Sequence, residues 1–295
     1  MTRRGSAFAG VSVAIVTPFR DDAVDLAKLR EQIEFQIAAG VTCVVPVGTT
    51  GESPTLDREE RKTLIAETIQ IVAGRIKVMA GTGSNSTREA VAMTEWAAKQ
   101  GADATLQVGP YYNKPMAEGF YRHFRAAAEA CPLPVCVYNV PGRTSKNIEP
   151  ETIIRLAELS NVTMVKEASG SIDQSSQILA ATDLTVLSGD DSLTLPIMAV
   201  GGEGIVSVAA NVVPERFVEL CKAFAAGDLK RAQALHLELF PLCRNMLGLA
   251  SNPIPVKTAM KLQGRDSGEL RLPMSALDEE GVSRLKQTLK QAKIL

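Results

Sequence analysis

The segment Val162-Thr163-Met164-Val165-Lys166-Glu167-Ala168-Ser169-Gly170 joins an apolar run to a lysine and then to turn-forming residues. An apolar run without a polar face is typical of a parallel strand that is covered on both sides. Alternation along such a strand places Lys166 on the same side as Met164 and Val162. Lys166 would then lie at the rim of a dry interior, where burial favours the neutral, nucleophilic amine. The alternative is a strand-end lysine that reaches solvent, and this stretch alone favours that alternative because perturbed lysines are uncommon.

Seven further apolar, β-rich runs occur along the chain, with helical patterns between them. They begin near Ser12, Thr42, Ile76, Ala104, Val135, Leu184 and Gly204. Eight strand–helix units with short connections predict an α/β fold, the (β/α)8 TIM barrel, rather than an open doubly wound sheet. The residues after the first run, Thr17-Pro18-Phe19-Arg20, lack the G-x-G-x-x-G pattern that an open dinucleotide-binding sheet should show.

Helix starts are marked by capping residues. Asp25 is a predicted N-cap, and Asp57-x-x-Glu60 and Ser86-x-x-Glu89 are predicted capping boxes. After about residue 214 the strand patterns stop. We therefore expect a catalytic barrel over residues 1–226 and a C-terminal helical region over 227–295 that packs on it, with helices at 229–249, 255–262 and 275–294.

The composition excludes several classes of partner. The 295 residues are 45% hydrophobic and 22% charged, with a net charge of -1, and Lys and Arg are not clustered. Nucleic acid and anionic membrane surfaces are therefore not expected as partners. No later stretch is long and apolar enough to cross a bilayer. The protein is expected to be cytoplasmic.

The cysteines and the N-terminus fit that location. Five cysteines occur without C-x-x-C spacing, which indicates small core residues of a reducing compartment rather than a disulfide framework or a zinc site. Arg3-Arg4 and the apolar run 7–16 would suit a secretory signal. The run ends in Thr17-Pro18-Phe19 without a clear small-residue cleavage site, so a first β-strand is the better interpretation.

Barrel active sites lie at the C-terminal ends of the strands. The strand ends of this chain supply hydroxyl groups, one lysine and one arginine. The candidate site residues are Lys166, Tyr138, Thr49, Tyr112, Thr50, Arg143, Gly189 and Val206.

A metal or cofactor is not expected. The two histidines, His123 and His236, fall in helical segments away from the strand ends. Asp190 and Asp191 could ligate magnesium, but helix N-caps are the better interpretation. Their charge would also repel phosphate, which disfavours phosphorylated substrates and flavin mononucleotide.

Metal-free chemistry around Lys166 remains. A neutral lysine attacks a ketone to form a Schiff base, whose protonated nitrogen draws electrons during enamine formation at the adjacent carbon. Tyr138 ends the preceding strand and is a candidate proton shuttle. The Gly48-Thr49-Thr50-Gly51 turn is either a cradle for a carboxylate or only a tight βα loop.

With these residues placed, the chain resembles the dihydrodipicolinate synthase family within the pyruvate-dependent class I aldolase superfamily. The resemblance covers essentially the whole chain and reverses the interpretation of Lys166. It rests on Gly48-Thr-Thr-Gly-Glu-Ser53, Gly81-Thr-Gly83, Pro110-Tyr-Tyr-Asn113, Tyr138-Asn-Val-Pro-Gly-Arg-Thr144, Lys166-Glu-Ala-Ser-Gly170, Ser188-Gly-Asp-Asp191 and Asn252-Pro-Ile-Pro-Val-Lys257.

The resemblance implies condensation of pyruvate with L-aspartate 4-semialdehyde, in the diaminopimelate route of lysine biosynthesis. Lys166 would form the Schiff base and Tyr138 would transfer protons. Thr49 would link Tyr138 to Tyr112, which in the family comes from a neighbouring subunit. A homo-oligomer is therefore implied, a tetramer built as a dimer of dimers.

The resemblance also implies how the substrates bind. Thr50 would hold the pyruvate carboxylate, and Arg143 would bind the carboxylate of the semialdehyde through its guanidinium fork. Arg143 could instead be a surface residue of a polar loop.

Two alternatives stay open. One is a sister lyase that cleaves a sugar acid, such as N-acetylneuraminate lyase or a 2-keto-3-deoxy-acid aldolase. Arg143 and the Tyr111-Tyr112 pair favour the synthase over these. The other is a catalytically silent barrel that only binds a keto acid or serves in an assembly, against which the joint presence of Lys166, Tyr138 and the threonines argues.

The chain departs from the pattern of lysine-inhibited relatives at two positions. Arg58 and Arg61 stand where inhibited enzymes commonly have histidines, although Glu89 keeps the expected residue type. An arginine keeps its charge at pH 7, whereas histidine is mostly neutral there. The added positive charge should oppose a ligand with two ammonium groups, so weak or absent inhibition by L-lysine is predicted.

Overall fold

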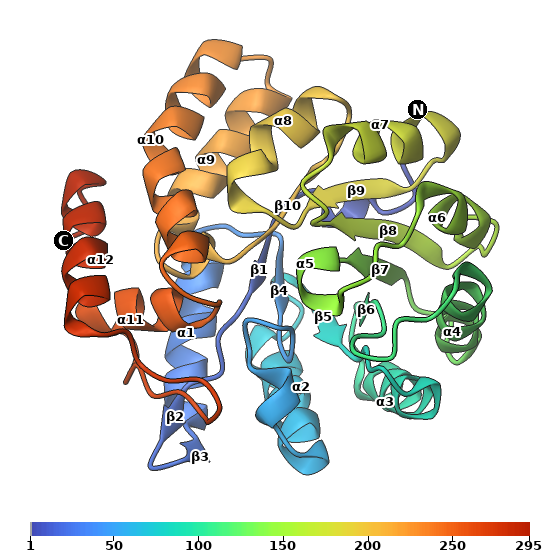
Figure 1. Ribbon diagram of the computed structural model, residues 1–295, viewed down its shortest axis with the longest axis horizontal. Helices are drawn as coiled ribbons and strands as arrows, with labels where there is room; N and C mark the ends of the chain where they lie inside the picture. Colours follow the sequence, from blue (N-terminus) through green and yellow to red (C-terminus); the bar gives the residue numbers. More distant parts are fainter. Residues whose placement is uncertain (1) are drawn as a thin grey trace.

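The computed structural model describes residues 2–295 and contains a closed barrel of eight parallel strands (Figure 1). Going round the barrel, the order of the strands is β1, β10, β9, β8, β7, β6, β5 and β4. The strands are β1 (Gly10–Ala14), β4 (Cys43–Val45), β5 (Lys77–Gly81), β6 (Ala104–Val108), β7 (Val135–Asn139), β8 (Val162–Glu167), β9 (Thr185–Ser188) and β10 (Gly204–Ser207). The predicted (β/α)8 TIM barrel is confirmed.

Helices surround the barrel and alternate with its strands (Figure 1). They are α1 (Leu26–Ala38), α2 (Arg58–Val72), α3 (Thr87–Gln100), α4 (Ala117–Glu129), α5 (Pro141–Thr144), α6 (Pro150–Leu156), α7 (Ile172–Ala181), α8 (Thr194–Ala199) and α9 (Pro214–Ala225). Among residues 2–295, no helix combines the length and apolar character needed to cross a bilayer.

Two kinds of buried cluster build the core. Side chains inside the barrel, among them Cys43, Met79, Met164 and Leu187, form one cluster. Larger clusters lie between the outer faces of the strands and the helices. Every residue of β8 is buried, as expected for a strand covered on both sides.

One expected orientation on β8 is wrong. Val162 packs with Val165 in an outer cluster, whereas Met164 belongs to the cluster inside the barrel. The cause is an irregularity in the pairing of β7 and β8, where Val135 pairs with Val162 but the next residue pairs with Met164. The extra residue on β8 shifts the alternation, as a β-bulge does.

The predicted helix starts are only partly correct. Asp25 accepts a hydrogen bond from Lys28 N, and Asp57 and Glu60 form a reciprocal capping box at α2. Ser86 makes no capping hydrogen bond at α3, so that predicted box is wrong. The backbone N–H of Ser86 donates to Ser84 Oγ at 3.1 Å instead.

The N-terminal apolar run contains β1, which pairs with β10 and β4 in the barrel, so the predicted first β-strand is confirmed. A small antiparallel hairpin of β2 (Phe19–Arg20) and β3 (Ala23–Val24) follows it, which the sequence pattern did not indicate. All five cysteines are free and buried.

Three helices follow α9: α10 (Leu229–Gly248), α11 (Ile254–Leu262) and α12 (Glu279–Gln291). Helix α10 packs against α9, and α11 contacts both α10 and α12 on one side of the barrel (Figure 1). The last helix begins four residues later than expected, because Asp278 caps it by accepting from Gly281 N. A domain boundary at residue 226 stays a prediction.

Candidate functional site

Lys166 and Tyr138 lie side by side at the C-terminal ends of neighbouring strands. Strands β7 and β8 are paired so that Tyr138 stands opposite Lys166. The Lys166 Nζ atom lies 4.0 Å from the centroid of the Tyr138 ring. The two residues are only 4% and 5% exposed. The barrel thus holds an amine and a phenol together in a nearly dry position.

Thr49 and Thr50 lie in the turn that follows β4. Thr50 is 2% exposed, and its Oγ1 accepts a hydrogen bond of 2.9 Å from Asn252 Nδ2. Thr49 is half-buried, and no hydrogen bond among the described residues joins it to Tyr138. The proposed hydroxyl relay through Thr49 therefore stays a prediction.

The same turn is held in an unusual backbone conformation. Val47 has φ 58° and Glu52 has φ 55°, in the left-handed region that side chains rarely adopt. Such conformations persist where surrounding contacts fix them, and they often accompany functional sites. Here the surrounding contacts include a buried ion pair between Glu52 and Lys257, at 2.8 Å.

Arg143 lies on the short helix α5, which follows directly after β7. Its side chain is exposed, and its Nη2 donates a 3.1 Å hydrogen bond to the carbonyl oxygen of Asn252. This bond uses only part of the guanidinium fork, so other N–H donors remain for a ligand. Figure 1 shows α5 over the strand ends near the centre of the barrel.

Gly189 and Val206 come from the next two strands of the barrel. Val206 is fully buried in the cluster inside the barrel that also contains Tyr138. Gly189 follows β9, and its N–H donates to Glu167 O at 2.7 Å. A Cβ at Gly189 would lie 2.6 Å from the Ala168 Cβ, so a larger residue would displace the chain just after Lys166.

Tyr112 is not part of this buried group within a single chain. It has φ 71° and is 89% exposed. The loop that carries it is fixed by Asn113 Nδ2, which donates to Asn85 O at 2.8 Å, and by Asn85 Nδ2, which donates to Tyr111 O at 3.2 Å. A well-anchored loop thus presents a large aromatic side chain outward.

The expected helix-capping role of Asp190 and Asp191 is wrong for the short turn that follows them. Asp190 makes no capping hydrogen bond. Asp191 accepts from Ser207 Oγ and from the N–H groups of Val208 and Ala209, and so ties β9 to β10. Burial raises the pKa of Asp191 to about 6, and these hydrogen bonds oppose the rise.

Asp190 lies close enough to Lys166 for their charges to interact. Burial raises the pKa of the Asp190 carboxyl, and the positive charge of Lys166 opposes the rise. His123 and His236 lie on α4 and α10, as expected. Among residues 2–295, no cluster of three or more His, Cys, Asp or Glu side chains is arranged to hold a metal ion.

One supporting residue was quoted in the sequence motifs without a role. Glu167, beside Lys166, is buried on the outer face of β8. It accepts hydrogen bonds from Ser169 N at 2.7 Å, Gln174 Nε2 at 3.0 Å and Asn139 Nδ2 at 3.2 Å. Burial raises the pKa of this carboxyl, and the three donors oppose the rise. The network anchors the strand end that carries Lys166.

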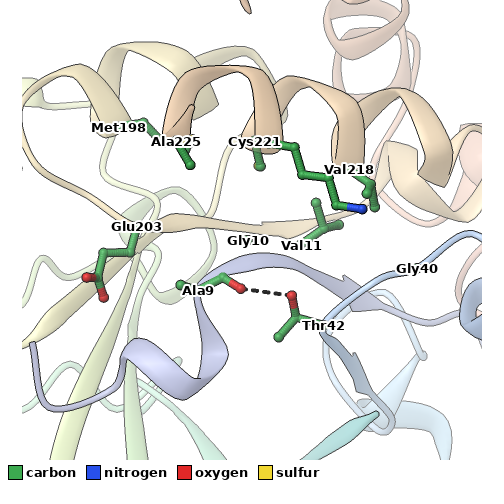
Figure 2. Close-up of a pocket in the computed structure, with 11 residues that line it drawn as sticks. Ala9, Gly10, Val11, Gly40, Thr42, Met198, Glu203, Val218, Cys221 and Ala225 are labelled. Atoms are coloured by element: carbon green, nitrogen blue, oxygen red, sulfur yellow. Dashed lines mark hydrogen bonds between the residues drawn. The ribbon is translucent and has the colours of Figure 1, made fainter. Parts of the chain in front are cut away.

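A separate cavity of about 280 Å³ lies at the opposite end of the barrel (Figure 2). It is lined by the start of β1, by Thr42 before β4 and by residues of α9 that include Val218 and Cys221. The Thr42 hydroxyl is bonded to Ala9 O at 2.8 Å, and Glu203 accepts from Ser6 and Thr185. Thr42 and Glu203 therefore have hydrogen-bond partners within the protein, and barrel active sites lie at the other end.

The group at the C-terminal end of the barrel combines four functions. A buried amine can attack a carbonyl, a neighbouring phenol can transfer protons, a hydroxyl-lined turn can bind a carboxylate, and an exposed guanidinium can bind a second anion. Together they suit the carbon–carbon bond chemistry of a keto acid.

Comparison with known proteins agrees with this arrangement. A family model described as the dihydrodipicolinate synthetase family matches residues 7–292. The 4-hydroxy-tetrahydrodipicolinate synthase of Geotalea daltonii is 50% identical over 290 residues, which cover 98% of this chain and 100% of the relative. The enzyme of the same name from Methanocaldococcus jannaschii is 49% identical over 284 residues, covering 96% and 98%.

A solved structure shares the fold closely. It is the chloride-inhibited dihydrodipicolinate synthase from Acinetobacter baumannii, complexed with pyruvate. It is 41% identical, covers 98% of this chain and 100% of its own, and superposes with a TM-score of 0.95. The chain therefore belongs to the dihydrodipicolinate synthetase family.

Proposed function

We propose that this protein condenses pyruvate with L-aspartate 4-semialdehyde through a Schiff base on Lys166, the activity of a 4-hydroxy-tetrahydrodipicolinate synthase. The observation that carries the proposal is the buried Lys166 Nζ, 4.0 Å from the Tyr138 ring centroid at the catalytic end of the barrel. The synthases that are about 50% identical over nearly the whole chain support the same reaction. The product enters the diaminopimelate route to lysine.

The reaction begins with attack of the Lys166 amine on the keto carbon of pyruvate. Loss of water gives a protonated Schiff base, and removal of a methyl proton gives an enamine. The enamine carbon then forms a bond to the aldehyde carbon of the second substrate, whose oxygen takes a proton. The amino group of that substrate finally attacks the Schiff-base carbon, which closes the ring and releases Lys166 as a free amine.

Tyr138 is well placed to move these protons, since its ring lies against the lysine side chain. Thr49 and the Tyr112 of a neighbouring subunit would complete the path to solvent. Thr50 would hold the pyruvate carboxylate, while Gly189 and Val206 would form the wall of the pyruvate site. Arg143 would bind the carboxylate of the semialdehyde.

A homo-oligomer, a tetramer built as a dimer of dimers, is part of this proposal. Its support is the 89% exposure of Tyr112 on an anchored loop, which leaves a side chain of a type enriched at interfaces available to a neighbouring subunit. One solved relative, 40% identical, is a monomeric dihydrodipicolinate synthase variant. The expected cytoplasmic location also belongs to this proposal.

The test is a parallel assay of purified protein. Pyruvate with aspartate semialdehyde should give turnover, whereas N-acetylneuraminate and 2-keto-3-deoxy sugar acids should not be cleaved at comparable rates. Borohydride with pyruvate alone should attach a three-carbon adduct to Lys166. Cleavage of a sugar acid at the faster rate would identify a sister lyase, and absence of the adduct would exclude Schiff-base chemistry.

A further inference from the structure

The strongest unassigned feature of the site is Asn252, which precedes α11 in the C-terminal helical region. It is 5% exposed and lies far along the chain from the residues that it contacts. Its Nδ2 donates to Thr50 Oγ1 at 2.9 Å, across 202 positions of sequence. Its carbonyl oxygen accepts from Arg143 Nη2 at 3.1 Å, across 109 positions. One residue thus contacts both proposed carboxylate-binding side chains.

The direction of the bond to Thr50 has a chemical consequence. A threonine hydroxyl has one proton to donate and two acceptor lone pairs. Because the Asn252 amide occupies one lone pair, the Thr50 proton must point elsewhere and remains available to donate to a carboxylate. A carboxylate at position 252 would reverse this bond and consume that proton.

The amide of Asn252 is not fully satisfied by the protein. Its Oδ1 atom is buried and has no hydrogen-bond partner among the described residues. Most buried polar atoms in proteins have a partner, and the exceptions often serve a function.

The segment that carries Asn252 is fixed to the same turn at a second point. Lys257 Nζ donates to Glu52 Oε1 and to Thr17 O, each at 2.8 Å. The side chains of Lys257 and Glu52 are 0% and 1% exposed. The second oxygen of Glu52 accepts from Arg271 N at 3.1 Å. A buried ion pair with these additional hydrogen bonds fixes geometry, because neither charge can move without losing its partners.

We propose that Asn252 is a positioning residue that aims the Thr50 hydroxyl at the pyruvate carboxylate while its backbone supports Arg143. The inference rests on the proposed function, in which Thr50 and Arg143 bind the two substrates. The C-terminal helical region thereby contributes to substrate binding, with the Lys257–Glu52 pair as its fixed point.

The two contacts of Asn252 can be separated experimentally, since Thr50 contacts the side chain of Asn252 and Arg143 contacts its backbone carbonyl. Asn252→Asp has nearly the same shape but reverses the bond to Thr50, and Asn252→Ala removes that bond. The KM for pyruvate should rise roughly 10-fold or more in Asn252→Asp and less in Asn252→Ala, as expected for a lost hydrogen bond to a charged group. The KM for the semialdehyde at saturating pyruvate should change by less than about 3-fold.

The matched control is Asn245→Asp, also in the C-terminal region. Asn245 Nδ2 donates to Thr288 Oγ1 on α12, and no side-chain hydrogen bond joins Asn245 to a site residue. The same substitution there should leave both KM values near those of the wild type. Melting temperature and oligomeric state are measured for all variants, so that a loss of structure is recognised.

Borohydride trapping with pyruvate separates the two proposals. If the wild-type protein forms no adduct, the proposed function fails. If the wild type is trapped and both Asn252 variants bind pyruvate like Asn245→Asp, only the positioning role is overturned. Equal increases in both KM values, or failure of both Asn252 variants to fold, would show that Asn252 has only a structural role. Either result would also overturn the proposed positioning role. A selective rise in the KM for pyruvate supports the proposal.

Discussion

Lys166 Nζ lies 4.0 Å from the centroid of the Tyr138 ring, because β7 and β8 are paired with these two residues opposite each other. Both side chains are buried at the end of the barrel where its active sites lie. An amine in this position is largely shielded from water. The pairing thus connects the register of two strands to the proposed covalent chemistry.

Replacement of Lys166 should abolish that chemistry without unfolding the protein. Lys166→Ala should show no turnover and no borohydride adduct, while its melting temperature stays close to that of the wild type. Lys166→Arg should also be inactive, because a guanidinium remains protonated and cannot attack a carbonyl. Mass spectrometry after reduction with pyruvate measures the adduct, and appreciable synthase activity in either variant would contradict the mechanism.

Arg143→Ala should separate the two half-reactions. The Arg143 side chain is exposed in the single chain, so its loss should not expose a buried partner charge. We expect near-normal trapping of pyruvate and a loss of about 10- to 100-fold in kcat/KM for the semialdehyde, the range for a hydrogen bond to a charged group. Lys146→Ala, at an exposed position nearby, is the control. Equal loss of trapping and turnover would mean that Arg143 is structural.

Tyr112→Phe tests the shared site. Removal of the hydroxyl should lower kcat by about 10²- to 10⁴-fold if it takes part in proton transfer. Tyr121→Phe, which removes a tyrosine hydroxyl from α4, should leave kcat nearly unchanged. Mixing Tyr112→Phe with Lys166→Ala subunits should restore some activity, because a hybrid dimer contains one complete site. No recovery despite demonstrated subunit exchange would count against a contribution from the neighbour.

The predicted insensitivity to L-lysine gains support from an ion pair. Arg58 Nε lies 3.6 Å from Glu89 Oε1, so the carboxylate that would accept a lysine ammonium already has a cationic neighbour. Titration of synthase activity at neutral pH should show little inhibition below millimolar L-lysine. The double replacement Arg58→His and Arg61→His should increase inhibition, whereas Arg75→His, just beyond the C-terminal end of the same helix, should not. Strong inhibition of the wild type at sub-millimolar lysine would disprove the electrostatic argument.

His123 should make the protein less stable in acid. Burial lowers its pKa from 6.5 to about 4. Between these values the unfolded chain binds a proton that the folded protein does not, so the free energy of unfolding falls as the pH decreases, by on the order of 3 kcal/mol in total. In His123→Phe the melting temperature should therefore fall less steeply from pH 7 to pH 4.5 than in the wild type.

Two comparisons isolate this effect. Asp191 has its pKa raised to about 6, so its protonation favours the folded state in acid. This contribution is the same in the wild type and in His123→Phe. His236→Phe should change the dependence of melting temperature on pH less than His123→Phe does, because His236 is only half-buried. Identical slopes for the wild type and His123→Phe would show that His123 does not contribute to acid sensitivity.

Local pattern was sufficient to predict the barrel strands and Lys166 at the end of one of them. Burial on both faces produces short apolar runs, and carboxylates such as Asp57 bond to backbone groups only three residues away. These interactions depend on near neighbours, so they can be recognised in the sequence. The orientation of Val162 toward the outer cluster could not be predicted, because it results from the irregular pairing of β8 with β7.

Hydrophobic patterning predicts the eight-stranded barrel, and the strand ends predict the residue types at its rim. How those residues are held depends on contacts that form on folding: Asn252 lies between Thr50 and Arg143, and Lys257 is buried against Glu52. These contacts join residues 109 to 205 positions apart, and hydrophobic periodicity carries no information about such pairs. They form because closure of the barrel and packing of α10 and α11 bring distant polar groups into a dry space, where each must find a partner.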